Sequence, residues 1–342
     1  MSDKTERIVL DAAYQPQVRI GRDTRRLMLD VIIALLPAVI VGVLQFGIHI
    51  LLLLLISICS AVFWEWLYRR LFKKDASIGD LSAALTGLLL AMTLPPSAPL
   101  WLPLVGTFFG IVIVKQLYGG IGKNFLNPAL AGRAFLFSSY STIMTSWSVP
   151  NALSGTIDGT TMATPLAGLY GDGLPAYFTA KSMFMGYLPG CIGEISAFAV
   201  LIGFGYLLWR EVISWRIPVS FVGTVALLTL IFGKSGYSNG SWMLFNIFSG
   251  GLMFGAVFMA TDYTTSPVTL NGQLLYGAGC GMLVVLIRYF GGFPEGVTYA
   301  ILIMNLCTWA IDKGFHRHQF GVSKADIAFS KAEKLAAKEA GK

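Results

Sequence analysis

LMLDVIIALLPAVIVGVLQFGIHILLLLLISICSAVFWEWLY, residues 27–68, consists of two long apolar runs that adjoin one another. A helix needs about 20 predominantly apolar residues to cross the ~30 Å hydrocarbon core of a bilayer. Each of the two runs has about that length. The stretch therefore predicts two membrane-spanning helices, at 27–46 and 48–68.

The rest of the chain repeats this pattern. Of the 342 residues, 55% are hydrophobic and only 13% are charged, about half the charged share of an ordinary soluble domain. This composition excludes a water-soluble globule and predicts an all-α polytopic membrane protein with about ten transmembrane helices. Eight further apolar runs lie at 81–95, 100–117, 126–145, 188–209, 217–232, 242–260, 274–289 and 296–311.

The basic residues indicate how the chain is oriented. The net charge is +7, but the Lys and Arg side chains sit between apolar runs, so we reject nucleic acid as a partner. With a cytoplasmic N-terminus, all 25 basic residues except Lys181, Lys234 and Arg288 lie inside, as the positive-inside rule requires. We expect a multi-pass protein of the cell (inner) membrane with five parts: a cytoplasmic N-terminal segment (1–26), helices one to five (27–145), an external loop (146–187), helices six to ten (188–312) and a cytoplasmic tail (313–342).

Two pairs of similar segments suggest an internal repeat. GIVIVKQLYGG at 110–120 resembles GMLVVLIRYFGG at 281–292, and LLLAMTLPPSAP at 88–99 resembles VFMATDYTTSP at 257–267. The partners lie five predicted spans apart, and an odd offset inverts the second copy. The pattern predicts a five-plus-five inverted repeat with broken helices, an arrangement that often surrounds a shared site. Chance similarity between apolar sequences is the alternative.

Several charged residues fall within or at the ends of predicted spans, where a charge is costly unless protein or water solvates it. For Arg288 and Asp312, we expect the side chain to extend to the membrane surface, where water solvates its charge. For Arg133 and Glu194, a structural ion pair and a functional role are both open. The full set is Arg133, Glu194, Asp262, Arg288, Glu295 and Asp312.

Two polar sequences combine amide or carboxylate groups with Pro or Gly. Asn124 and Asn127 lie in GKNFLNPALAG, and Asp262 lies in FMATDYTTSP. Such sequences break helices and free backbone carbonyls to line a polar cavity. Two interpretations of these polar sequences are compatible with the residues: a cofactor pocket, and a cation path that includes Asp262 and Glu194.

The sequence contains no pattern for a metal site or for nucleophilic catalysis. The four cysteines lie far apart in apolar runs, and we expect them to be small buried hydrophobic residues. They are Cys59, Cys191, Cys280 and Cys307. With only three histidines, we expect no metal ligands and no catalytic residue in this chain.

The external loop contains DGTTMATPL at 158–166. Thr164 has small neighbours and precedes a proline, so its hydroxyl is a modest candidate for covalent modification beyond the lipid.

This loop and most of the remaining chain resemble the D subunit of the Rnf ferredoxin:NAD oxidoreductase and its relative, the B subunit of the sodium-pumping NADH:quinone reductase. The resemblance includes GGIGKNFLNPALAGRAF, GYLPGCIGEIS and GGFPEGVTYAILIMN. It implies that a flavin transferase joins FMN through a phosphoester to Thr164, with Asp158, Thr161 and Ala163 completing the attachment motif. Two residues depart from the family pattern: Met162 stands where the reductase has Gly, and Tyr263 stands where relatives have Pro.

The resemblance implies a flavin-carrying subunit that moves electrons between reduced ferredoxin and NAD, with coupled export of Na+ or H+. The implied partners are the iron–sulfur and flavin subunits of the complex and the membrane lipid. A second, noncovalent flavin, riboflavin, is expected on the cytoplasmic side at Asn124 and Asn127. The alternatives are the B subunit of the quinone reductase, a secondary transporter with its substrate site near Asn127 and Asp262, and a purely structural membrane partner.

Overall fold

The computed structural model describes residues 23–74, 78–148, 150, 164–171, 179–234, 236–291 and 295–315. The first part contains α1 (Thr24–Phe46), α2 (Ile48–Leu71), η1 (Ile78–Asp80), α3 (Ser82–Met92), α4 (Leu102–Phe108), η2 (Phe109–Gln116), α5 (Pro128–Ser139) and α6 (Ser141–Met144). Two short helices follow, α7 (Pro165–Tyr170) and α8 (Ala180–Met185). The last part contains α9 (Ala197–Trp209), α10 (Arg216–Ile231), α11 (Asn239–Phe248), α12 (Leu252–Phe254), η4 (Gly255–Met259), α13 (Leu270–Phe290) and α14 (Val297–Gly314).

The described residues form an all-α structure with several apolar helices, which confirms the predicted fold class. Each of the ten predicted spans contains a helix. Among the described helices, only α1, α2 and α13 are long and apolar enough to cross a bilayer alone. A fourth candidate span consists of α11 followed by α12 and η4, with a bend of 61° between them. The helices within the predicted spans 81–95 and 188–209, which are α3 and α9, are shorter than those spans. Proline and glycine near the ends of these runs interrupt the helical hydrogen bonds.

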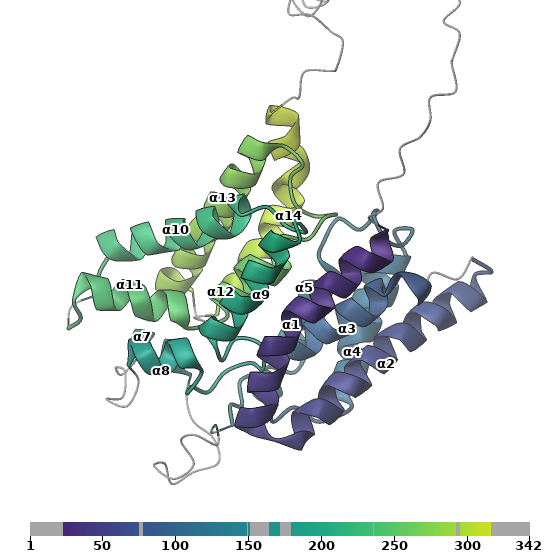
Figure 1. The fold of residues 1–342 in the computed structure, drawn as a ribbon, viewed down its shortest axis with the longest axis horizontal. Helices are drawn as coiled ribbons and strands as arrows, with labels where there is room; N and C mark the ends of the chain where they lie inside the picture. Colours follow the sequence, from purple (N-terminus) through teal and green to yellow (C-terminus); the bar gives the residue numbers. More distant parts are fainter. Residues whose placement is uncertain are drawn as a thin grey trace, which may run out of the picture.

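The helices pack in two similar groups. In the first, α2 packs against α3 and α4; in the second, α10 packs against α11 and α13. Across the groups, α1 packs against α9 and α5 against α14 (Figure 1). These cross-contacts join helices that are five predicted spans apart, which is the pattern an inverted repeat produces. The repeat stays a prediction, and the packing supports it.

Glycines allow helix backbones to approach closely at two of these contacts. On α13, Gly277 and Gly281 face α10, and a Cβ at Gly281 would lie 2.8 Å from the carbonyl oxygen of Phe221. Between α1 and α9, a Cβ at Gly203 would lie 2.3 Å from the carbonyl oxygen of Ala34. Small residues are typical of helix contacts in membranes, because apolar lipid gives no hydrophobic drive for association and close packing takes its place.

The outer surface of the helices is apolar. On α1, Leu36, Ile40 and Leu44 are exposed while Leu35 and Ala38 are buried. A helix that is apolar on all sides is suited to a lipid environment. This surface also explains a wrong prediction about the cysteines: Cys191 and Cys280 are buried, but Cys59 and Cys307 are exposed, because a thiol is compatible with an apolar solvent.

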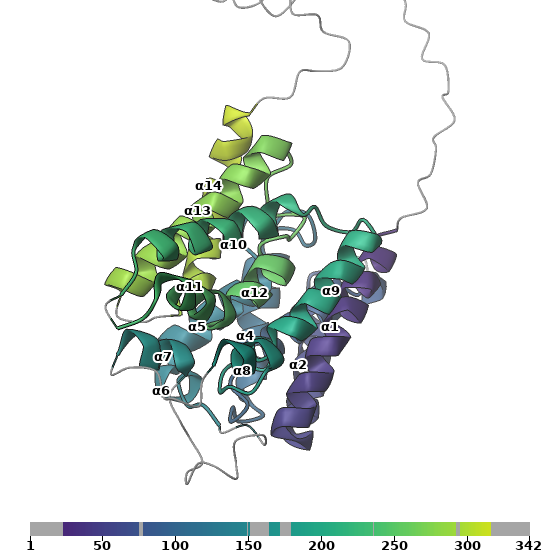
Figure 2. The ribbon, with the colours of Figure 1, turned by 60° about the vertical axis from the view of Figure 1, so that its left-hand side comes forward.

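The two ends of the structure carry different parts of the chain. Both views place α7 and α8 at one end, opposite the last turn of α14 and the first turn of α1 (Figure 2). The described helices of segment 146–187 thus lie at the end opposite the first turn of α1 and the last turn of α14. Which side is cytoplasmic remains a prediction from the basic residues.

The α1–α9 contact gives a test of the packing. Gly203→Ala should lower the thermal unfolding temperature in detergent, because the new methyl group meets the Ala34 carbonyl, and overpacking costs about 1–3 kcal/mol. Gly205→Ala is the matched control on the same helix, since a Cβ there meets nothing within 4 Å. Equal unfolding temperatures for the two variants would show that α1 and α9 do not pack in this way.

Candidate functional site

Thr164 is the N-cap residue of α7. Its Oγ1 accepts a hydrogen bond from the backbone N–H of Ala167 at 3.2 Å, and Pro165 occupies the first helical turn. The residue is only 5% exposed. The Thr164 hydroxyl is thus hydrogen-bonded and largely covered by protein, which the sequence motif alone does not reveal. Asp158, Thr161 and Ala163 lie outside the described residues.

Contacts with the second half of the chain hold α7 in place. A helix of six residues is not stable in isolation. Leu166 and Leu169 are buried against Trp242. The ammonium group of Lys234 donates to the carbonyl oxygens of Leu169 (3.2 Å) and Tyr170 (3.3 Å), which satisfies the end of the helix. The segment that carries Thr164 is thus a fixed element of the described structure.

A polar chain connects α7 to α13. The Tyr170 hydroxyl donates to Asn246 Oδ1 at 2.8 Å. The Arg288 guanidinium donates to the backbone carbonyls of Asn246 at 2.6 Å and Ser249 at 3.1 Å. These carbonyls belong to the C-terminal end of α11, where the chain bends into α12. Arg288 therefore supplies the donors that the broken helix lacks.

The expectation that Arg288 and Asp312 extend to the membrane surface is wrong for Arg288. Arg288 is only 2% exposed, because the carbonyls freed at the helix break bind it inside the protein. Asp312 also has a structural role: its carboxylate accepts from the backbone N–H groups of Val268 (3.2 Å) and Thr269 (3.4 Å) at the start of α13. A carboxylate at this position is favoured by the helix dipole.

A cavity of about 340 Å³ lies between the first turns of α1, one side of α3, the end of η2, the start of α5 and the segment after η4. Pockets for small molecules typically measure about 300–1,000 Å³. Asn124, Asn127 and Asp262 all line it, together with apolar side chains such as Leu27 and Leu89. The two helix breaks predicted from the sequence therefore meet at one cavity.

Hydrogen bonds between the breaks shape this cavity. Asn127 caps α5 by accepting from Ala129 N–H at 3.0 Å, and its Nδ2 donates to the carbonyl of Met259, at the end of η4, at 3.2 Å. Asn124 Nδ2 donates to Thr264 Oγ1 at 2.9 Å. Each asparagine thus ties the first half of the chain to the second.

Asp262 continues this network. Its Oδ2 accepts from the hydroxyls of Thr264 at 3.1 Å and Thr265 at 3.0 Å. The neighbouring Tyr263 donates its hydroxyl to the carbonyl of Val212. Hydrogen bonds of both Asp262 and Tyr263 thus connect this break to its surroundings.

Glu194 and Arg133 lie in a separate place. Arg133 donates to the carboxylate of Glu295 at 2.9 Å and to Cys191 Sγ at 3.2 Å. Glu194 Oε1 accepts from the backbone N–H of Cys191 at 2.8 Å. Two voids of about 10 Å³ flank Arg133, each about the size for one water molecule. The structure thus gives Arg133 an ion pair with Glu295 and does not bring Glu194 into the cavity of Asp262.

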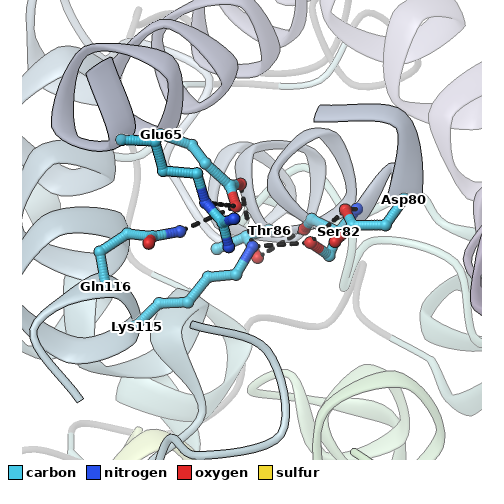
Figure 3. A network of polar contacts seen from close by, with 7 residues as sticks. Glu65, Asp80, Ser82, Thr86, Lys115 and Gln116 are labelled. Atoms are coloured by element: carbon cyan, nitrogen blue, oxygen red, sulfur yellow. Dashed lines mark hydrogen bonds and ion pairs between the residues drawn. The ribbon is translucent and has the colours of Figure 1, made fainter. Parts of the chain in front are cut away.

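Sequence reasoning missed a buried ion pair at the cavity wall (Figure 3). Glu65, on α2, has a fully buried side chain, and its Oε2 accepts from Lys115 Nζ at 3.0 Å. Gln116 donates to Glu65 Oε1 at 2.8 Å. From the sequence we counted Lys115 among the basic residues on the cytoplasmic side and did not consider Glu65. The signal was available, because the two predicted spans 48–68 and 100–117 each carry one charge of opposite sign.

Comparison with known proteins places the chain among relatives along almost all its length. Residues 11–321 match the family model described as the NQR2, RnfD, RnfE family. The D subunit of the Na+-translocating ferredoxin:NAD+ oxidoreductase complex of Acetobacterium woodii is 44% identical over 92% of this chain and 96% of its own length.

Two further relatives are named for other or unspecified ions. The D subunit of the proton-translocating ferredoxin:NAD+ oxidoreductase complex of Clostridium ljungdahlii is 42% identical over 92% of this chain and 97% of its own length. The D subunit of the ion-translocating oxidoreductase complex of Actinobacillus succinogenes is 34% identical over 87% of this chain and 94% of its own length. The chain belongs to the NQR2, RnfD, RnfE family.

Proposed function

We propose that this chain is the flavin-carrying membrane subunit of an ion-pumping complex that moves electrons between reduced ferredoxin and NAD. The observation that carries the proposal is that one helical body holds two candidate flavin positions. Thr164, on α7, and the cavity at the first turn of α1 lie toward opposite ends of that body. The names of the relatives, which are subunits of ferredoxin:NAD+ oxidoreductases, support it.

The first position is a covalent one. Thr164 would hold FMN as a phosphoester. Its hydroxyl would lose a proton and displace the leaving group from the phosphate of an activated flavin nucleotide, in a step catalysed by a separate flavin transferase and guided by Asp158, Thr161 and Ala163. The bound flavin would supply two-electron acceptance and single-electron release, which no side chain of this protein offers. The protein's own contribution is position, because Leu166, Lys234 and the Tyr170 hydrogen bond fix the helix that starts at Thr164.

The second position is the cavity, where we propose a noncovalent flavin such as riboflavin. Asn124 Nδ2 has both N–H groups bound to protein, which leaves its Oδ1 as an acceptor. Asn127 donates one side-chain N–H to the carbonyl of Met259, and the other has no acceptor among the described residues. An acceptor beside a donor matches the N3–H and carbonyl groups of the isoalloxazine edge, and the apolar walls match its dimethylbenzene side.

Coupling to ion export is the remaining part of the proposal. Na+ is a hard ion that prefers carboxylate, hydroxyl and carbonyl oxygens, and Asp262, with the Thr264 and Thr265 hydroxyls, offers such groups. Glu194 is a weaker candidate because it lies outside this cavity. The relatives at 44% and 42% identity are named for Na+ and for protons, so overall similarity leaves Na+ and H+ both open.

We assign the supply and removal of electrons to partner subunits. This chain has no catalytic residues in the proposal, so iron–sulfur and flavin subunits of the same complex, in the inner membrane, supply and remove the electrons. The relatives' names favour the D subunit of an Rnf complex over the B subunit of the quinone reductase. A secondary transporter would use the same cavity for a transported substrate and would need no flavin.

Thr164→Val should abolish covalent flavin, because it removes the only oxygen of the side chain. The measurement is peptide mass spectrometry of the protein coexpressed with its flavin transferase, where the wild-type peptide gains the mass of FMN less water. Thr179→Val is the matched control, since Thr179 also caps a short helix, α8, and its Oγ1 also accepts from a backbone N–H.

The control separates loss of the cap from loss of the attachment site. Each substitution removes one N-cap, at a cost of about 1 kcal/mol, but only Thr164→Val should leave the protein unmodified. Wild-type protein without the added mass would overturn the covalent part of the proposal and favour the transporter.

Thr86→Phe should expel the noncovalent flavin by filling the cavity, which Thr86 lines. Acid extraction should then release far less flavin per mole of protein than from the wild type, while covalent FMN stays unchanged. Thr142→Phe, at an exposed position on α6, is the control. Equal extractable flavin in both variants would place the second flavin elsewhere.

A further inference from the structure

We propose that Lys115 donates a hydrogen bond from its buried ammonium group to the pyrimidine edge of the flavin in this cavity and raises that flavin's reduction potential. The inference rests on the proposed second flavin. It adds a specific residue and a specific effect, and it arises from the way Lys115 is held.

Lys115 lies on η2, a π-helical segment that continues α4. Such wide turns are rare and occur frequently at functional sites. The residue is 2% exposed, yet it forms part of the cavity wall together with Ser82. A lysine this far buried is costly unless its charge is paired and its N–H groups are bound.

Two of the three N–H groups of Lys115 are bound to protein. One donates to Glu65 Oε2 at 3.0 Å and one to Ser82 Oγ at 2.6 Å (Figure 3). Ser82 in turn donates its hydroxyl to Asp80 at 2.6 Å, which fixes it as an acceptor for Lys115. The third N–H has no acceptor among the described residues. A carbonyl oxygen of a molecule in the cavity would satisfy it.

Lys115 belongs to a cluster of charged groups. Glu65 accepts from Gln116 and lies 3.6 Å from the guanidinium of Arg69, so Lys115 shares this carboxylate with a second cation. The carboxylate of Asp80 is joined to Lys115 only through the Ser82 hydroxyl. Lys115, Asn124 and Asn127 all line this cavity. A flavin with its pyrimidine edge toward the two asparagines would therefore also offer a carbonyl oxygen to the third N–H of Lys115.

The redox consequence follows from where charge accumulates. A flavin bound here would supply redox chemistry in which electrons from an iron–sulfur carrier of the complex add negative charge to the N1–C2=O region of its pyrimidine ring. A cationic donor next to that region stabilises the reduced form and raises the potential.

The test uses the assembled complex and measures the midpoint potential and the amount of noncovalent flavin by spectroelectrochemistry and acid extraction. Lys115→Met should weaken flavin binding about 10- to 100-fold, the effect expected for one charge-assisted hydrogen bond, and lower the potential of the flavin that remains. Lys115→Arg should retain most of both. The potential of the covalent FMN should not change in any variant.

Glu65→Gln distinguishes a flavin ligand from a structural ion pair. It leaves Lys115 in place with a less compensated charge, so the potential should rise, opposite in sign to Lys115→Met. If Lys115 served only to neutralise Glu65, both variants would lower assembly or unfolding temperature and leave the potential of the bound flavin unchanged. This result would overturn the inference.

The outcomes also separate this inference from the proposed function. Wild-type protein without extractable flavin would contradict the second flavin itself, and this inference with it. Wild-type protein with flavin, together with an unchanged potential in Lys115→Met and Glu65→Gln, would contradict only the role of Lys115.

Discussion

Every backbone group that a broken helix releases inside a membrane must find its partner within the protein, because lipid offers no hydrogen bonds. This constraint organises the structure. The carbonyl of Met259 is bound by Asn127, and those of Asn246 and Ser249 are bound by Arg288. At each break, the donor comes from a different helix, so the breaks themselves connect distant parts of the chain.

The same constraint places the functional groups. Because Asn124 and Asn127 must reach across to the segment after η4, the two breaks face each other and leave a cavity between them. Because Arg288 must satisfy the end of α11, the side chain of Asn246 is presented to Tyr170 on the helix that begins at Thr164. One candidate flavin position, the cavity, thus lies at the breaks themselves, and the other, Thr164, begins a helix that is hydrogen-bonded to a break through Tyr170.

Sequence reasoning succeeded where a property is local. Apolar runs predicted the helices, and Pro or Gly beside Asn124, Asn127 and Asp262 predicted breaks. It failed where the outcome depends on which helix lies opposite. Arg288 stands at a helix end, so extension to the surface was a reasonable expectation, but the carbonyls that hold it come from a segment about 40 residues away in sequence.

The pairing of Glu65 with Lys115 shows the same limit, since its members are separated by 50 positions. The burial of Thr164 is also a tertiary effect. In the proposed electron path, these non-local contacts set the environment of each flavin, whereas the motif sets only where the first one is attached.

A cryo-electron microscopy map of the mature, flavinylated complex would test both flavin positions directly. We expect density continuous with Thr164 Oγ1 that fits FMN, and a second planar density in the cavity beside Asn124, Asn127 and Lys115. A map in which Thr164 carries nothing and the cavity holds lipid or side chains alone would contradict both positions.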